Sequence, residues 1–320
     1  MPMQQLIARI ERHKAGESVG IFSVCSAHPW VIRAALAQAV RRGEPVLIEA
    51  TSNQVNQFGG YTGMTPAQFR DAVWHQANEC GLPRYRVWLG GDHLGPNAWQ
   101  DRPVAEAMAL TETLIDDYVA VGFRKIHLDC SMRCQDDSAQ LDYGQLSQRA
   151  ARLCAVVERC WRLDGGEPPV CIIGTEVPVP GGAHEALDGL AMTTPQAVEQ
   201  TLSTHRQAWR AAGLEAVWPR VIELVVQPGV EFDHQSVERY RPERDAALSR
   251  FIEQWPHMVY EAHSTDYQSP QMYQELVRDH FDILKVGPAH CVKRYLRWTA
   301  LSGNGKASIA RPTFAPPWSR

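Results

Sequence analysis

Asp92 and His93 lie in the octet Gly90-Gly91-Asp92-His93-Leu94-Gly95-Pro96-Asn97, which directly follows a strand-like segment ending at Leu89. An acid and an imidazole therefore stand side by side where a strand is predicted to end. The glycines let the backbone approach a ligand closely, and Pro96 prevents the turn from continuing as a helix. An Asp-His pair in this position can bind a metal ion or transfer a proton. An ordinary structural hydrogen bond is the alternative role for either residue.

The same pattern of a strand followed by polar residues recurs along the chain. Eight short apolar, β-branched runs predict strands at Gly20–Val24, Val46–Ala50, Arg86–Gly90, Lys125–Asp129, Val170–Gly174, Val221–Val226, Met258–Ala262 and Ile283–Val286. Residues that could do chemistry stand at or near the ends of these runs: Asn53, Asp92, Asp129, Glu176, His263, Ser264 and Lys285. Ionisable groups are costly to bury unless they are paired or bound to a ligand. The recurrence therefore favours one shared site over unrelated structural contacts.

Helix-like patterns separate the strands and predict how the strands are covered. They are His28–Arg42, Thr65–Cys80, Pro103–Val121, Tyr143–Arg162, Thr194–Ala212, Arg241–Trp255 and Ser269–His280. Continuous apolar strands that alternate with amphipathic helices indicate a parallel sheet covered by helices. Eight such units predict a closed (β/α)8 TIM-type barrel over residues 1–289, in which the chemistry lies on the loops after the strands.

Side chains alternate between the two faces of a strand, which predicts groups that point the same way. If Asp129 points into the barrel, so do His127 and Lys125, and if His263 does, so does Glu261. Lys285 has two alternative roles, Schiff-base chemistry and an anion-binding or hydrogen-bonding contact, of which we favour the second. Asn53 lies in a polar loop suited to the hydroxyl groups of a sugar.

Composition excludes several classes of function. The chain of 320 residues is 44% hydrophobic and 21% charged, with a formal net charge of -4 and a pI near 6.3. These values, without a basic run rich in aromatic residues, argue against a nucleic-acid partner. The N-terminal residues do not resemble a signal peptide, and no apolar run has membrane-spanning length. The eight cysteines are scattered, which favours reduced thiols in a cytoplasmic protein.

Several segments together resemble the GatZ/KbaZ family, the non-catalytic subunits of bacterial tagatose-1,6-bisphosphate aldolase. They are SVCSAHPWV, IEATSNQVNQFGGYTGMTP, GGDHLGPNAWQ, GFRKIHLDCSM, IGTEVPVPGGAHE, VVQPGVEFDH, YEAHSTDYQ and ILKVGPA, spread from about Gly20 to Ala289. Details such as Cys134-Gln135-Asp136-Asp137 are more similar to the KbaZ branch, of the N-acetylgalactosamine pathway, than to the galactitol branch. The resemblance implies a partner, a zinc-dependent class II aldolase subunit that yields glyceraldehyde 3-phosphate and dihydroxyacetone phosphate. It also implies a chaperone-like role in the activity and stability of that partner.

The resemblance has a second implication, because some relatives look like metal-dependent keto-sugar epimerases. Asp92-His93 resembles the aldolase arrangement of a proton-transferring Asp followed by a metal-binding His. His93, Glu176 and His263 would supply a ligand set suited to zinc or manganese. Asp92 and Asp129 would then be the two proton carriers that epimerisation needs, and Ser264 and Lys285 would contact the substrate. The alternative is that these residues are relics of a shared barrel ancestor.

The last part of the chain departs from the family pattern. The resemblance stops at Ala289, and residues 290–320 form a divergent, proline-rich tail. A shift of one nucleotide converts codons for Cys291-Val292-Lys293 into a family-like Leu-Arg-Glu-Ala. We therefore expect an atypical eighth helix and a tail that is an out-of-frame extension.

Overall fold

Eight parallel strands close into a barrel in the computed structural model, which describes residues 1–174, 190–232 and 236–287. The strands are β1 (Ile21–Cys25), β2 (Val46–Thr51), β3 (Val87–Asp92), β4 (Lys125–His127), β5 (Val170–Ile173), β6 (Val221–Val226), β9 (Val259–Ala262) and β10 (Phe281–Val286). Their order around the barrel is β1-β10-β9-β6-β5-β4-β3-β2. The predicted TIM-type fold is confirmed, and each strand lies within two residues of its predicted bounds.

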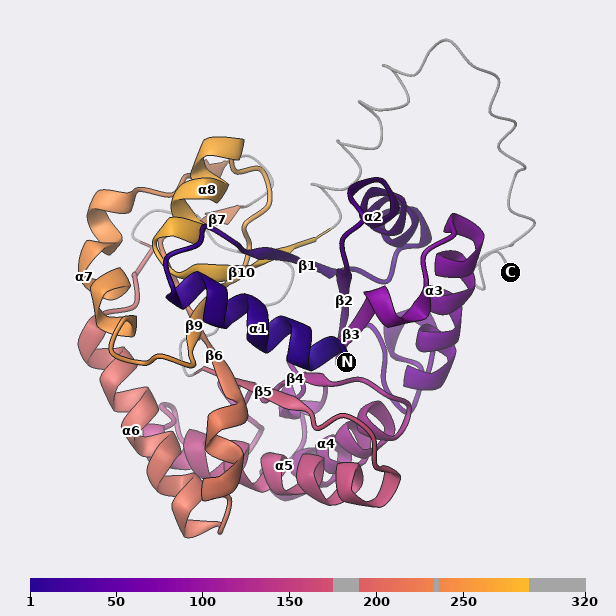
Figure 1. Cartoon of the computed structure of the whole chain (residues 1–320). Helices are drawn as coiled ribbons and strands as arrows, with labels where there is room; N and C mark the ends of the chain where they lie inside the picture. Colours follow the sequence, from indigo (N-terminus) through magenta and orange to yellow (C-terminus); the bar gives the residue numbers. More distant parts are fainter. Residues whose placement is uncertain (175–189, 233–235, 288–320) are drawn as a thin grey trace.

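Helices surround the barrel as the sequence predicts (Figure 1). They are α2 (Pro29–Arg42), α3 (Pro66–Cys80), α4 (Val104–Ala120), α5 (Tyr143–Asp164), α6 (Pro195–Ala211), α7 (Pro242–Ile252) and α8 (Pro270–Arg278). Thr65 caps α3 in a capping box with Gln68, and Thr194 caps α6, each directly before a proline. The helix predicted to follow the eighth barrel strand, β10, and the tail 290–320 fall outside the described residues.

Helix α1 (Pro2–Lys14) lies across the N-terminal end of the barrel (Figure 1). The sequence pattern did not predict this helix. Met3, Leu6 and Ile10 are buried on its inner face. They pack on interior residues that share this end of the barrel, Ile21, Leu47, Trp88, Val170, Ile172, Ile222, Val225, Val259 and Ile283. Each buried aliphatic side chain contributes about 1.5 to 3 kcal/mol. This helix precedes the first β/α unit, so the repeat pattern does not reveal it.

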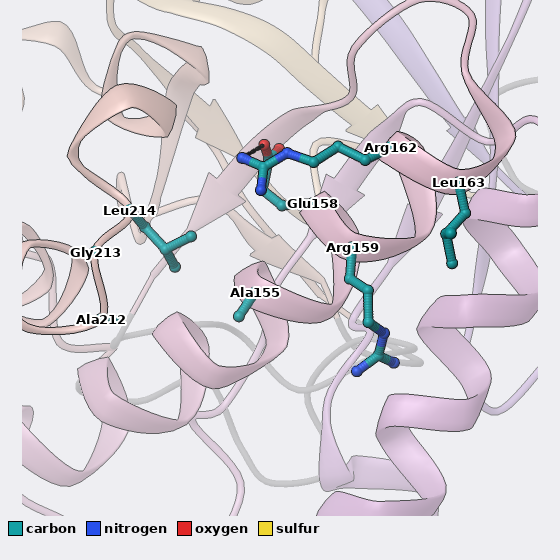
Figure 2. Close-up of a pocket in the computed structure, with 8 residues that line it drawn as sticks. All are labelled: Ala155, Glu158, Arg159, Arg162, Leu163, Ala212, Gly213 and Leu214. Atoms are coloured by element: carbon teal, nitrogen blue, oxygen red, sulfur yellow. Dashed lines mark hydrogen bonds and ion pairs between the residues drawn. The ribbon is translucent and has the colours of Figure 1, made fainter.

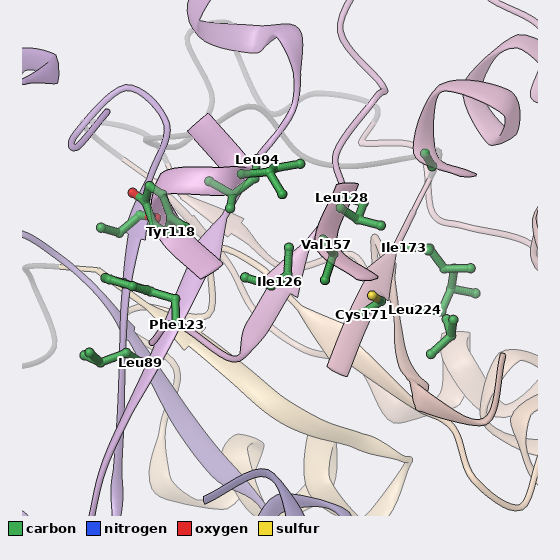
Figure 3. Close-up of a cluster of buried hydrophobic side chains, with 14 of the residues drawn as sticks. Leu89, Leu94, Tyr118, Phe123, Ile126, Leu128, Val157, Cys171, Ile173 and Leu224 are labelled. Carbon is green, nitrogen blue, oxygen red and sulfur yellow. The ribbon is translucent and has the colours of Figure 1, made fainter. Parts of the chain in front are cut away.

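The main hydrophobic core lies between the strands and the helices, as Figure 3 shows. Leu89, Ile126 and Leu224 project outward from β3, β4 and β6 into this layer. Tyr118 of α4 is fully buried there, and its hydroxyl donates to the carbonyl of Val55 at 2.9 Å. This layer fixes the strands, so the loops at their carboxyl ends start from rigid positions.

Short elements complete the described chain. Four 3-10 helices lie at η1 (Gly60–Thr62), η2 (Arg84–Arg86), η3 (Pro96–Trp99) and η4 (Glu215–Arg220). The expectation that Pro96 excludes a helix was wrong, because a proline fits the first turn of a helix and η3 begins at it. An antiparallel pair, β7 (Glu231–Phe232) and β8 (Val237–Glu238), follows β6 and was not predicted. No helix in the described residues is long and apolar enough to cross a membrane.

Candidate functional site

A buried lysine, Lys125 of β4, lies inside the barrel among glutamates from three other strands. Its Nζ is 2.8 Å from Glu49 of β2, 3.2 Å from Glu223 of β6 and 2.5 Å from Glu261 of β9. Gly90 makes room for this cluster, because a Cβ there would lie 2.5 Å from the Glu49 carboxylate. All four charged side chains are fully buried.

Electrostatics decides which of these groups are charged. Burial would lower the pKa of Lys125, but the surrounding glutamates outweigh burial and raise it well above its ordinary value. Burial raises the pKa of Glu223, and its neighbours Glu261 and Glu49 raise it further, against the opposing effect of Lys125. Lys125 is therefore held as an ammonium ion, and Glu223 has the stronger tendency to keep its proton.

A second lysine, Lys285 of β10, lies closer to the strand ends. Its Nζ is 3.0 Å from both Glu49 and Glu261, and it also contacts Asp92 of β3. Burial would lower the pKa of Lys285, but these carboxylates, Asp92 first, raise it well above its ordinary value. A Schiff-base nucleophile needs a neutral amine, so this pairing disfavours that role.

Three histidines form a cluster at the carboxyl ends of β3, β4 and β9. The ring centroids of His93, His127 and His263 are 5.1 to 5.6 Å apart. Each ring has one nitrogen hydrogen-bonded to a carboxylate: His93 Nδ1 to Asp129 at 2.7 Å, His127 Nδ1 to Asp92 at 2.8 Å, and His263 Nε2 to Glu261 at 2.7 Å. Such a bond fixes the tautomer and the orientation of a ring, which is typical of metal-binding histidines.

The donor atoms of this region fit a divalent metal ion. Atoms of Asp92, His127, Glu261 and His263 lie within 4.8 Å of one another. The Nε2 of His127 is buried and has no hydrogen-bond partner among the described residues. A buried imidazole nitrogen left unpaired beside carboxylates is a suitable ligand for zinc or manganese. These side chains could therefore hold the metal that the sequence led us to expect.

The structure brings together part of the predicted metal set. His93 and His263 lie in the histidine cluster, whereas Glu176 falls outside the described residues. His127 belongs to the cluster although it was not among the predicted ligands. Its signal in the sequence was the alternation that placed it on the same strand face as Asp129. Glu223 gave no such signal, because its strand reads as an apolar run.

The two predicted proton carriers are both ionised carboxylates. Burial would raise the pKa of Asp129, but His93 and other neighbours outweigh it and lower the pKa well below its ordinary value. Burial acts on Asp92 in the same way, and His93 and Lys285 lower its pKa well below the ordinary value. Ser131 also donates to Asp129 through its backbone N–H at 2.9 Å and its hydroxyl at 2.6 Å. Both aspartates therefore accept hydrogen bonds at neutral pH, and a lowered pKa makes each a weaker base than an ordinary carboxylate.

Two neighbouring histidines have opposite pKa shifts. Burial would lower the pKa of His93, but Asp92 and Asp129 outweigh it and raise the pKa. Burial and the charge of Lys285 lower the pKa of His263 to about 4, despite its bond to Glu261. Two adjacent imidazoles therefore have pKa values shifted in opposite directions, which suits an acid and a base that act side by side.

The loop after β3 is fixed by close packing against the end of β4. The backbone N–H of Leu94 donates to the carbonyl of His127 at 2.9 Å. A Cβ on Gly95 would lie 1.4 Å from the carbonyl oxygen of Asp129, so no other residue fits there. His93 itself has a φ of +47°, in the left-handed region that non-glycine residues seldom occupy. Strained backbone of this kind is frequent at functional sites.

The predicted substrate-binding residues lie in three places around the strand ends. Asn53 is half-buried in the loop after β2, where its carbonyl accepts from the backbone of Tyr61 at 2.9 Å. Ser264 follows His263 directly, has a φ of +52° and hydrogen-bonds with Glu231. Lys285 points into the carboxylate cluster described above. Their contact with a substrate stays a prediction.

A separate pocket lies on the helical layer rather than at the strand ends (Figure 2). It has a volume of about 430 Å³ and lies between α5 and the turn after α6. Its acidic residue, Glu158, is already paired with Arg220 at 2.7 Å and with Arg162 at 3.5 Å. Nothing in this pocket resembles the arrangement of histidines and carboxylates inside the barrel.

Comparison with known proteins assigns the family. Residues 5–295 match the family described as D-tagatose-1,6-bisphosphate aldolase subunit GatZ/KbaZ-like. The chain belongs to this family. It is also similar to a probable tagatose 6 phosphate kinase from Sinorhizobium meliloti, with 48% identity and a TM-score of 0.76. That match covers 84% of this chain, which spans 65% of the length of the other protein.

More distant structures share the fold of this GatZ/KbaZ-like chain. A fructose-bisphosphate aldolase from Campylobacter jejuni has 15% identity and a TM-score of 0.55, over 94% of this chain and 79% of that one. The YdjI aldolase from Escherichia coli has 10% identity and a TM-score of 0.53, over 92% of this chain and 86% of that one. At such identities the likeness extends to the barrel and no further.

Proposed function

We propose that this chain is an accessory subunit of tagatose-1,6-bisphosphate aldolase, of the KbaZ branch, acting in the cytoplasm. In this role it raises the activity and the stability of a catalytic class II aldolase subunit in the degradation of D-tagatose 6-phosphate. The observation that carries the proposal is the family match over residues 5–295. The products of the partner's reaction would be glyceraldehyde 3-phosphate and dihydroxyacetone phosphate.

The interior of the barrel is compatible with a supporting role. Lys125 and Lys285 are both held by buried carboxylates, so neither amine is free to attack a carbonyl. Each histidine of the cluster is likewise held by an acid. A barrel built in this way can be rigid without turning over a substrate of its own, which suits a protein that stabilises a partner.

Co-expression with a class II tagatose-bisphosphate aldolase subunit tests the accessory role. Cleavage of tagatose 1,6-bisphosphate is followed over time for the partner alone, this chain alone and the two together. We expect no cleavage by this chain alone, and a longer half-life of activity when both are present. An unrelated TIM-barrel protein is the control for non-specific protection. Cleavage by this chain alone, or equal protection by the control, would refute the proposal.

A second candidate function is that of a metal-dependent keto-sugar epimerase, favoured by the histidine cluster. When bound, the metal would polarise the ketose carbonyl. Asp92, His127, Glu261 and His263 would hold the metal, with His93 beside them. Asp129 and His93 would hold and move a proton at one face of the sugar. Incorporation of deuterium from heavy water into a ketose, measured by NMR with manganese present, would support this function.

A further inference from the structure

The ammonium group of Lys285 lies where the carboxylates of the candidate metal site converge. Its Nζ is 3.0 Å from Glu261 Oε1 and contacts Asp92 Oδ1. These are the same two oxygens that accept from the histidines, Asp92 Oδ1 from His127 at 2.8 Å and Glu261 Oε1 from His263 at 2.7 Å. The two acid–histidine pairs that suit a metal ion are thus already gathered around a cation.

Charge balance explains why a cation is needed there. Five buried acids line this interior, Glu49, Asp92, Asp129, Glu223 and Glu261, and two lysines oppose them. The acids outnumber the lysines by five to two, so each ammonium group is shared by several carboxyl groups. Carboxylates brought together away from water repel one another strongly unless a positive charge lies between them. Lys285 supplies that charge to Glu49, Asp92 and Glu261 together.

We propose that Lys285 is an internal counter-cation that competes with a divalent metal ion for Asp92 and Glu261. It holds these carboxylates together in the metal-free protein, and its ammonium group withdraws when a metal ion binds. Lys285 therefore sets the metal affinity of the site and keeps that affinity low. This inference rests on the candidate metal site and is independent of the accessory role.

Lys125 provides a matched comparison for Lys285 within the same barrel. Both ammonium groups are buried and both contact Glu49 and Glu261. Lys125 contacts the other oxygen of Glu261, Oε2, and Glu223 instead of Asp92. It therefore touches neither oxygen that the histidines share. Removing its charge should destabilise the barrel without opening the metal site.

Metal titration of the metal-free protein tests this inference. Zinc and manganese affinities are measured by calorimetry and by competition with a chelator for the wild type, Lys285→Met and Lys285→Gln. We expect both variants to bind at least about tenfold more tightly than the wild type, because no ammonium has to be displaced. The unfolding midpoint of the variants should also rise more on metal addition. Lys125→Met should gain less affinity than either Lys285 variant, because Lys125 touches neither oxygen that the histidines share.

Every outcome decides the question. Unchanged or weaker binding by both Lys285 variants would overturn the inference, and so would an equal gain in Lys125→Met. Should the variants fold poorly, recovery only in metal-supplemented medium supports the exchange of one cation for another. Insolubility with and without metal counts against it. Activation of the partner aldolase by the wild type is measured separately, so failure here leaves the accessory role standing.

Discussion

Asp92 accepts a hydrogen bond from His127 at 2.8 Å although 35 positions separate the two residues. Its neighbour in sequence, His93, lies 3.4 Å from it and makes its shorter contact, at 2.7 Å, with Asp129. The two acid–imidazole pairs therefore cross between the ends of β3 and β4. Each loop supplies an acid to the other, so the two strand ends are fixed as one unit. This crossing makes the geometry of the candidate site dependent on both loops.

The crossing predicts that Asp92→Asn weakens metal binding. The variant removes the carboxylate that orients His127, and loss of such an orienting group typically costs about 10- to 100-fold in metal affinity. We expect the affinity for zinc or manganese to fall accordingly, as measured by calorimetric titration. Asp71→Asn, at a carboxylate on the exposed face of α3, is the control and should bind metal like the wild type. Equal affinity in Asp92→Asn would place the metal elsewhere.

The ionic interior predicts a large cost for Lys125→Met. Removing the ammonium leaves Glu49 and Glu261 to share Lys285 and leaves Glu223 without its ion pair, and breaking a buried pair in this way costs about 3 to 5 kcal/mol. Urea unfolding followed by circular dichroism would measure the loss. Arg33→Met breaks the exposed ion pair with Glu79 and should cost less than about 1 kcal/mol. Similar losses in both variants would contradict the conclusion that Lys125 stabilises the buried glutamates through its charge.

The close approach at Gly95 predicts that Gly95→Ala is poorly tolerated. The added methyl group would overlap the carbonyl of Asp129, so the loop after β3 must move away from β4. We expect a loss of about 3 kcal/mol or more in unfolding free energy, together with reduced metal retention. Gly144→Ala, in the first turn of α5, meets only the flexible side chain of Asp142 and is the matched control. A Gly95→Ala variant as stable as Gly144→Ala would show that this packing is not required.

Asp245 of α7 predicts a pH-dependent stability. It is buried, and neither carboxylate oxygen has a hydrogen-bond partner among the described residues. Burial and then Asp279 raise the pKa of Asp245 to about 7, although Arg244 opposes them. The pKa of Asp245 is higher in the folded than in the unfolded protein. The neutral carboxyl therefore contributes to the free energy of unfolding, and this contribution is fully present below about pH 4. It is lost as the pH rises through about 7, where the buried carboxyl ionises.

Asp245→Asn removes that ionisation and tests whether it lowers the stability as the pH rises. We expect the variant to exceed the wild type in unfolding free energy by about 1 to 3 kcal/mol at pH 8. The advantage should shrink toward pH 4, where both side chains are neutral. Chemical unfolding at a series of pH values gives the measurement. A variant less stable than the wild type at pH 8 would mean that the charged carboxylate is stabilised by its surroundings.

The elements of the barrel could be predicted because their signals are local. A buried parallel strand reads as a short apolar run, and Thr65-Pro66 and Thr194-Pro195 mark helix starts. The ionic interior could not be predicted in the same way. Glu223 lies within an apolar run, and its contact with Lys125 depends on how β4 and β6 face each other across the closed barrel. The crossed pairing of Asp92 and Asp129 likewise depends on three-dimensional loop packing.

Helix α1 has a consequence for how the protein is made. It is synthesised before the eight barrel strands, yet it docks on Ile283 of β10, and its His13 lies 2.9 Å from Asp282. Strand β1 likewise pairs with β10. The residues of α1 therefore wait for nearly 270 later ones before they reach these native contacts. Until then the apolar face of α1 lacks its native partners, and exposed apolar surface of this kind makes a nascent chain prone to aggregate.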